Sequence, residues 1–132
     1  MIVSGSGVSI TPSYEEIKVN IGQKGAAPIV TGMSREHYVA TYHGTIVGWA
    51  ITGYPSGSIV VDILKKYQDL PQAWDTITGS DPPTLSSQDL NSNLQITAWS
   101  DVYVRPGDVF GINILSVTDV EHAVVTLQIM QH

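Results

Sequence analysis

The chain has no cysteine, a single phenylalanine and few charged residues, which make up 14% of its 132 residues. Without cysteine there is no disulfide framework, no thiolate nucleophile and no zinc–thiolate site. Soluble proteins usually carry about 25% charged residues. A surface this poor in charge is typical of a protein whose faces are partly covered by identical neighbours. We therefore expect its stability to come from packing and assembly.

Basic residues are scarce as well, because six lysines and arginines stand against twelve acidic residues and give a formal net charge of −6. This charge would repel the phosphate backbone of a nucleic acid, so we expect no nucleic-acid partner. The apolar runs are only a few residues long, and no basic, apolar signal-peptide pattern follows Met1. We expect a soluble chain with no membrane insertion.

What the sequence does contain is β-branched residues in short runs, separated by Gly, Pro, Asn, Asp and Ser. This pattern is typical of many strands joined by turns. About seven or eight strands with no strand–helix alternation predict an all-β fold, a two-sheet antiparallel sandwich that is jelly-roll-like. The predicted strands cover residues 15–21, 36–42, 45–52, 58–64 and 93–99, a run through Phe110, Ile112 and Ile114, and residues 121–130.

Two hairpins and one tight turn are predicted between these strands. His43 and Gly44 would join the second strand to the third, and residues 117–119 would join the last two strands. Residues 105–108 read Arg-Pro-Gly-Asp. Proline presets φ at the second position of a turn and glycine supplies a positive φ at the third, which predicts a type II turn here.

The segment around Lys65 is ambiguous. The spacing of Val60, Ile63, Leu64 and Tyr67 also fits a helix, whereas the β-branched run at residues 59–61 favours a strand. A short helical turn that ends before Pro71 is compatible with the sequence beyond Lys65.

The domain organisation is predicted to be simple. Residues 1–12 are rich in Ser and Gly, which predicts a flexible lead-in. Residues 13–132 are predicted to form a single β-sandwich domain, a natural size for one hydrophobic core.

Four sequence blocks between His43 and Ile129 keep a recognisable order and spacing. They read "HGTIVGWAITGYPSGSIVVDILK", "LPQAWDTITGSDPPTLSS", "LQITAW" and "VRPGDVFGINILSVTDVEHAVVTLQI". Together they resemble a domain repeated through the tail and virion structural proteins of double-stranded DNA bacteriophages. There the domain usually occupies the C-terminal part of fibre-like or minor structural proteins and is of a receptor-binding type.

The resemblance implies a protein made in the host cytoplasm and carried in the virion, in a tail fibre or baseplate. It also implies contacts with other virion proteins and a homotrimer. Separately from the resemblance, we expect the chain to adhere to host-surface polysaccharide. The turn reading Pro-Gly-Asp before an apolar strand is similar, as an analogy of fold only, to the trimeric jelly rolls of the tumour-necrosis-factor and complement-globular type. The alternative is a capsid decoration, head-fibre or assembly protein that contacts only other virion proteins.

The chain departs from the family at two places. The family commonly has a tryptophan where this chain has Leu64, and a Tyr- or Pro-rich loop where it has residues 68–73. The partner or ligand is therefore not carried over from the resemblance.

The candidate ligand-binding residues are Trp74, Asp75, Tyr54 and Tyr67. A loop tryptophan next to a carboxylate suits a saccharide, whose C–H face would stack on the indole while its hydroxyls meet the carboxylate. The competing interpretation, which comes first, is that Trp74 packs the loop onto the sandwich or against a neighbouring subunit. For Trp49 and Trp99, which lie on predicted strands, we expect core positions with each indole N–H bonded to a loop carbonyl.

We expect no enzyme, no metal and no cofactor. The histidines lack metal-ligand spacing, although a pairing of His43 with His122 across the sheets is an alternative. The aspartates of the long loop lack the dense pattern of a calcium loop, and the serines lack a nucleophile elbow. Asp62 lies in the most apolar strand, where it either faces outward or ties down the long loop. The residues concerned are His37, His43, His122, His132, Asp69, Asp75, Asp81, Asp89, Ser56, Ser58, Ser86 and Ser87.

Overall fold

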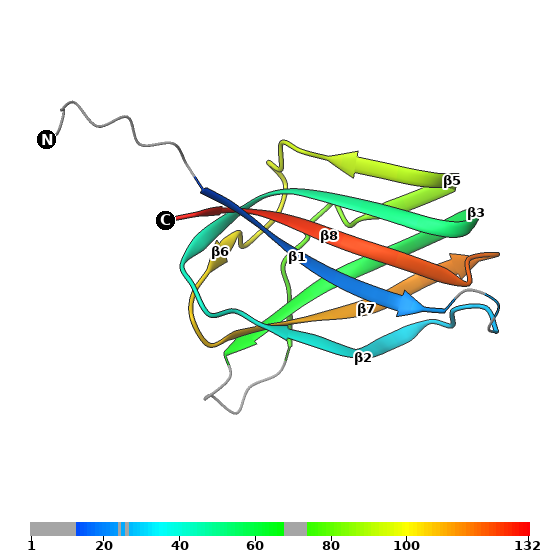
Figure 1. The fold of residues 1–132 in the computed structure, drawn as a ribbon, viewed down its shortest axis with the longest axis horizontal. Coiled ribbons are helices and arrows are strands. Elements are labelled where there is room, and N and C mark those ends of the chain that lie inside the picture. Colours follow the sequence, from blue (N-terminus) through cyan, green and yellow to red (C-terminus); the bar gives the residue numbers. More distant parts are fainter. Residues whose placement is uncertain (1–12, 24, 26, 68–73) are drawn as a thin grey trace, which may run out of the picture.

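The computed structural model describes residues 13–132 apart from residues 24, 26 and 68–73. The predicted lead-in at residues 1–12 therefore lies outside the described part. The described residues form strands and connections without a helix, and all strand pairs are antiparallel (Figure 1). The predicted all-β fold is thus confirmed. The strands are β1 (Ser13–Gly22), β2 (Gly32–Val39), β3 (Gly44–Tyr67), β4 (Asp75–Thr76), β5 (Thr84–Asn93), β6 (Tyr103–Val104), β7 (Asp108–Thr118) and β8 (His122–Gln131).

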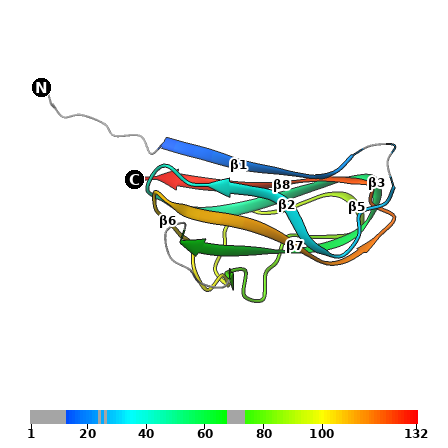
Figure 2. The same ribbon diagram turned by 90° about the horizontal axis from the view of Figure 1, so that it is seen from below.

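The long strand β3 belongs to both layers of the sandwich. Its first half, residues 44–54, pairs with β8, and its second half, residues 58–67, pairs with β7. The strand order is β1-β8-β3-β7-β2, and β4, β5 and β6 also pair with β3. One layer therefore holds β1, β8 and the first half of β3, and the other holds β2, β7 and the second half of β3 (Figure 2).

Gly57 marks the bend at which β3 passes from one layer to the other. The pairing of β3 with β5 shifts register on both sides of Gly57. A Cβ atom at this position would overlap the backbone oxygen of Thr118 and lie 2.9 Å from a methyl group of Val120. The two backbones approach more closely than any side chain allows, so this bend requires glycine.

Alternating side chains build the core between the two layers. On β8, Ala123, Val125, Leu127 and Ile129 are all at most 3% exposed. The inward positions of the other strands follow the same period of two. They include Ile17, Val19 and Ile21 on β1, Ile59, Val61 and Ile63 on β3, and Phe110, Ile112 and Ile114 on β7.

The two predicted hairpins are wrong. β2 pairs with β7, whereas the start of β3 pairs with β8, so residues 43–44 carry the chain to the other layer. β7 and β8 likewise lie on opposite layers, each beside a different half of β3. The short connections cross between layers because β3 offers both strands a partner.

The strand predicted at residues 93–99 is displaced. The strand in this region is β5, which ends at Asn93, and residues 94–99 are irregular. β5 is polar and buries only Leu85, which is 1% exposed, so it carries almost no apolar alternation. Backbone pairing with β3 makes it a strand against its weak intrinsic propensity.

The ambiguous segment after Ile63 remains extended, since β3 runs without a break to Tyr67. The rest of the predicted helical turn lies at residues outside the described part. The turn predicted at residues 105–108 is confirmed, because the Asp108 N–H donates to the Arg105 oxygen at 3.0 Å and Gly107 has a φ of 94°.

Strand registers define two ends of the sandwich. At one end Gly44 pairs with Gln131, close to both ends of the described chain, and we call this the terminal end. At the other end Gly22 and Tyr54 both pair with His122, next to the bend of β3, and we call this the bend end. Figure 1 shows these ends on the left and on the right of the molecule.

Candidate functional site

Trp74 lies on the outer face of the layer that contains β7. Its ring atoms approach to within 3.1 Å of the position where a Cβ of Gly111 would stand. Because Gly111 has no side chain, β7 offers a flat seat on which the indole packs. Trp74 stays half-buried there. The sequence interpretation that this residue covers the sandwich therefore describes its position.

Two side chains from neighbouring strands flank the indole. The Lys66 ammonium on β3 lies 4.5 Å from the centroid of the Trp74 ring. The His37 ring on β2 makes an edge contact, with the ring centroids 5.0 Å apart. Contacts of a cation and of an aromatic edge with an indole are each favourable by about 0.5–1 kcal/mol at exposed sites. Together they hold the ring in one orientation on the surface.

The other predicted ligand residues are not all close to Trp74. Asp75 is exposed on the two-residue strand β4, where it stands opposite Lys65 in the backbone pairing of β4 with β3. Tyr54 lies at the bend end, paired with His122. A strand rises about 3.3 Å per residue, so the eleven residues from Tyr54 to Lys65 separate the two places by most of the length of the molecule. The side chain of Tyr67 lies outside the described part.

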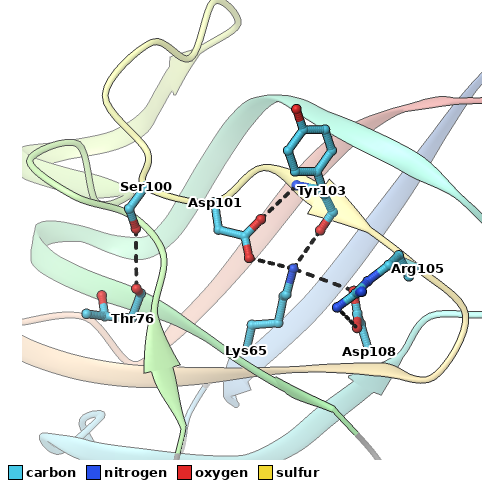
Figure 3. A network of polar contacts seen from close by, with 7 residues as sticks. All are labelled: Lys65, Thr76, Ser100, Asp101, Tyr103, Arg105 and Asp108. Atoms are coloured by element: carbon cyan, nitrogen blue, oxygen red, sulfur yellow. Dashed lines mark hydrogen bonds and ion pairs between the residues drawn. The ribbon is translucent and has the colours of Figure 1, made fainter.

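A buried ion-pair network around Lys65 lies at the terminal end. Lys65 is 6% exposed, and its ammonium lies 2.7 Å from an Asp101 oxygen and 3.5 Å from an Asp108 oxygen. It also donates a hydrogen bond of 2.8 Å to the backbone oxygen of Tyr103 (Figure 3). The network joins β3, β6 and β7, which belong to different parts of the sheet.

Asp108 is the most deeply buried member of this network, with no exposed surface. Its Oδ2 atom accepts the backbone N–H of Arg105 at 2.9 Å, which fixes the turn before β7. The Arg105 guanidinium lies 3.9 Å from Oδ1 of Asp108. A hollow of about 240 Å³ adjoins the network and is lined by Lys65, Asp101, Tyr103 and Arg105. The Lys65 ammonium already contacts acceptors from Asp101, Tyr103 and Asp108. The network therefore serves to hold the strands together.

Asp81 joins two of the three tryptophans. The indole N–H of Trp49 donates to its carboxylate at 3.1 Å, and the Asn93 amide donates to the same oxygen at 2.6 Å. The indole N–H of Trp99 donates to the backbone oxygen of Asp81 at 2.8 Å. The predicted loop carbonyl is confirmed for Trp99, whereas Trp49 bonds a carboxylate. Asp81 is thus a structural residue of the connection between β4 and β5.

Asp62 ties down the neighbouring segment by side-chain contacts. Its Oδ1 atom accepts hydrogen bonds from the hydroxyls of Thr76 at 2.6 Å and Thr78 at 2.8 Å. The sequence left open whether Asp62 faces outward or ties down the long loop. Asp62 does both, since it faces outward and also holds the segment that follows residues 68–73. Its carboxylate is thereby committed to two donors.

The histidines are spread over the molecule. His37 contacts Trp74, and the backbone N–H of His132 donates to the His43 oxygen at 3.0 Å. His43 lies at the terminal end and His122 at the bend end, so the alternative pairing of these two does not form. Among the described residues, no group of three or more His, Cys, Asp or Glu side chains could hold a metal ion. The described part also includes no helix able to cross a membrane.

A surface hollow at the bend end was missed by the sequence interpretation. It measures about 460 Å³ and lies between β3, β5 and β8. Tyr54 was named from sequence, but its neighbours in the hollow come from distant parts of the chain. Only the register of β3 against β8 and β5 reveals the group, which comprises Thr52, Gly53, Tyr54, Asp89, Leu90 and His122.

No protein-family model matches the chain, and a search of curated proteins gave no match. Among solved structures, the chain is similar to the crystal structure of a serine protease of Aeromonas sobria, with 7% sequence identity and a TM-score of 0.32. The match covers 98% of this chain, which spans 29% of that protein. A similarity this low carries no argument about function.

Proposed function

We propose that the chain is a non-enzymatic structural protein of a bacteriophage particle that adheres to host-surface polysaccharide. The observation that carries the proposal is the half-exposed indole of Trp74, seated on the outer face of β7 at Gly111. An indole presented on a rigid sheet offers an apolar plane for the C–H face of a sugar. Its neighbours His37, Lys66 and Asp75 offer donors and acceptors for the hydroxyls around that plane.

The virion setting rests on the resemblance of the four sequence blocks. Their first and last blocks supply β3, β7 and β8, which are the three central strands of the sheet order. The resemblance therefore falls on the strands that define this fold. A tail-fibre or baseplate position with three copies of the chain would present repeated weak sites, which raises the overall affinity without a deep pocket.

The hydrogen bonds of three aspartates support the non-enzymatic role that we propose. Asp62 accepts two threonine hydroxyls, Asp81 accepts an indole and an amide, and Asp108 holds a turn and faces Lys65. Each of these carboxylates has donors that fix neighbouring segments. General acid–base chemistry on a sugar instead needs two acids that face each other across a groove.

A second candidate function is capsid decoration or assembly, with contacts only to other virion proteins. It is favoured by large apolar side chains that are exposed on both layers, because a partner that covers them would remove apolar surface from water. The residues are Tyr14, Val30, Met33, Val39, Tyr54, Leu90, Leu94, Tyr103 and Leu115.

The test is binding of the purified chain to a glycan array and to envelope fractions from a panel of bacteria. We expect binding that is lost in Trp74→Ala and retained in Trp74→Phe, which keeps an aromatic plane. Tyr103→Ala is a matched control, because it removes an exposed aromatic ring from β6, which pairs with the first half of β3, whereas Trp74 is seated on β7. Light scattering should give a mass near three times 14.2 kDa for all of these chains.

Two results would separate the candidates. Binding to no envelope fraction, together with a trimer in solution, would favour assembly over adhesion. A monomeric mass in dilute buffer would contradict the trimer in both versions. Release of reducing ends from a bound polysaccharide would overturn the non-enzymatic role.

A further inference from the structure

The bend-end hollow combines an aromatic ring with polar side chains from three strands. Tyr54 is 51% exposed and lies directly opposite His122 in the pairing of β3 with β8. Thr52 lies two residues before Tyr54, on the same outer face, and pairs with Leu90 of β5. Side chains opposite each other in an antiparallel pair have Cβ atoms about 4.5–5.5 Å apart. The group is therefore compact, although its members are far apart in sequence.

The hollow exists because two strands separate here. β3 and β5 pair at Thr52 and Leu90, lose register, and pair again at Gly57 and Gln88. Asp89 stands in this irregular stretch and lines the hollow. The same bend that carries β3 between layers thus opens a depression on the outer face of the first layer. Its walls are strands of the main sheet, so its shape is fixed by the fold.

The polar groups of the hollow are available to a ligand. Among the described residues, neither the Asp89 carboxylate nor the His122 imidazole has a hydrogen-bond or ion-pair partner. A carboxylate accepts short, strong hydrogen bonds from hydroxyls, and an imidazole both donates and accepts. The Tyr54 ring and the Leu90 side chain add apolar surface beside them. An open hollow with one aromatic ring and a few convergent polar groups suits a sugar ring.

The chemistry selects a neutral saccharide. A free carboxylate in the hollow and a net charge of −6 on the chain disfavour phosphate, sulfate and acidic sugars. The volume of about 460 Å³ lies in the usual range for small-ligand sites. The hollow also lies at the opposite end of the sandwich from Ser13 and Gln131, which pair with each other at the terminal end. It therefore faces away from the point where the chain enters and leaves the sandwich.

We infer that the bend-end hollow is a binding site for a neutral pyranose saccharide, formed by Tyr54, Asp89 and His122 and separate from Trp74. The sugar stacks its C–H face on the Tyr54 ring, and its hydroxyls donate to Asp89 and bond to His122. This site is independent of the adhesion proposed for the Trp74 face, since Tyr54 lies at the bend end and Trp74 packs on Gly111, which pairs with Leu64 toward the terminal end.

The experiment is an amide NMR titration of the full chain with methyl α-glucopyranoside, methyl α-galactopyranoside and methyl α-mannopyranoside, with glycerol as a polyol control. We expect at least one pyranoside to shift amides at residues 52–54, 89–90 and 122, and glycerol to shift none of them. Asp89→Asn should weaken binding about tenfold, the usual effect of losing a hydrogen bond to a charged group. Tyr54→Ala should abolish the shifts.

Tyr103→Ala is the matched control, because Tyr103 is 64% exposed at the terminal end. This variant should bind like the parent chain. The melting temperature of each variant shows whether it is folded. If Tyr54→Ala does not fold, Asp89→Asn still tests the site. Shifts centred on His37 and Trp74, or no shift with any pyranoside, would overturn the inference. A chain that binds polysaccharide through Trp74 but shows no pyranoside shifts at residues 52–54, 89–90 and 122 would overturn the inference while leaving the proposed adhesion intact.

Discussion

The two ends of the sandwich are closed in different ways. At the terminal end, a buried ammonium and two aspartates join β3, β6 and β7, and Asp108 has no exposed surface. At the bend end, close backbone contacts and apolar side chains join the two layers. Gly57 lies against the Thr118 backbone, and Val120 is fully buried. One end depends on charge pairing and the other on close packing.

This difference separates stability from binding. At the terminal end the charged side chains pair with one another. Lys65 and Asp101, which line the hollow of about 240 Å³ there, therefore already have partners. The bend end closes its interior without polar groups, which leaves Asp89 and His122 free on its outer face among the described residues. We therefore expect substitutions of the buried charged residues at the terminal end to change folding, and those in the bend-end hollow to change binding.

Removal of the Lys65 ammonium should have the largest effect. Lys65→Met leaves the buried Asp108 carboxylate without its closest cation, and breaking a buried pair by removing one partner costs about 3–5 kcal/mol. Urea unfolding should show a loss of this size in the free energy of unfolding. The double variant Lys65→Met with Asp108→Asn should recover much of the loss, because the fully buried carboxylate is then neutral and the remaining Asp101 carboxylate is partly exposed. A single variant as stable as the parent would show that charge pairing does not hold this end.

A methyl group at Gly57 should be the next most harmful change. The added Cβ would overlap the Thr118 backbone, and overpacking that only backbone movement can relieve costs about 3 kcal/mol. Ser56→Ala is the matched control, since Ser56 is exposed one residue earlier and its change should stay within about 0.5 kcal/mol. Thermal unfolding of the two variants measures the difference. Equal melting temperatures would mean that the bend is not set by close backbone contact.

The sequence already contained more of the terminal end than its interpretation used. The alternation of the inward residues Ile59, Val61 and Ile63 continues to Lys65, and the alternation of Phe110 and Ile112 extends back to Asp108. Both charged residues are therefore in phase with the core, which is the local signal for a buried pair. The turn at residues 105–108 was predictable for a similar reason, because proline and glycine fix it within four residues.

The bend end could not be predicted in the same way. Tyr54 and His122 become neighbours only through the register of β3 against β8, and Asp89 through a register break in a strand with little apolar alternation. No local pattern shows that one strand serves two layers. The hairpin predictions failed at this point, because short connections were assumed to reverse within one sheet. The position of Trp74 on Gly111 likewise depends on a contact between distant segments.

The smallest expected effect concerns a polar group of the terminal end that has no partner. The Tyr42 hydroxyl is buried near Tyr38, but among the described residues no group meets it with good hydrogen-bond geometry. Burial raises the pKa of Tyr42 well above its ordinary value of 10.0, and the neighbouring Tyr38 and Glu15 add to the shift. The folded state therefore holds the phenol proton more tightly than the unfolded state.

Because the folded pKa is the higher one, this contribution to stability is fully present below pH 10 and is lost as the pH rises above it. Tyr42→Phe should change the free energy of unfolding by less than about 1 kcal/mol at neutral pH, since removing an unpaired buried hydroxyl is nearly neutral. It should also flatten the decline of stability between pH 10 and 11, measured by urea unfolding against the parent chain. Tyr103→Phe is the control, because it removes the hydroxyl of an exposed tyrosine at the same end of the molecule. A parent chain whose stability is constant above pH 10 would show that Tyr42 reaches solvent, so that Lys65 and its aspartates alone would account for the buried polar character of this end.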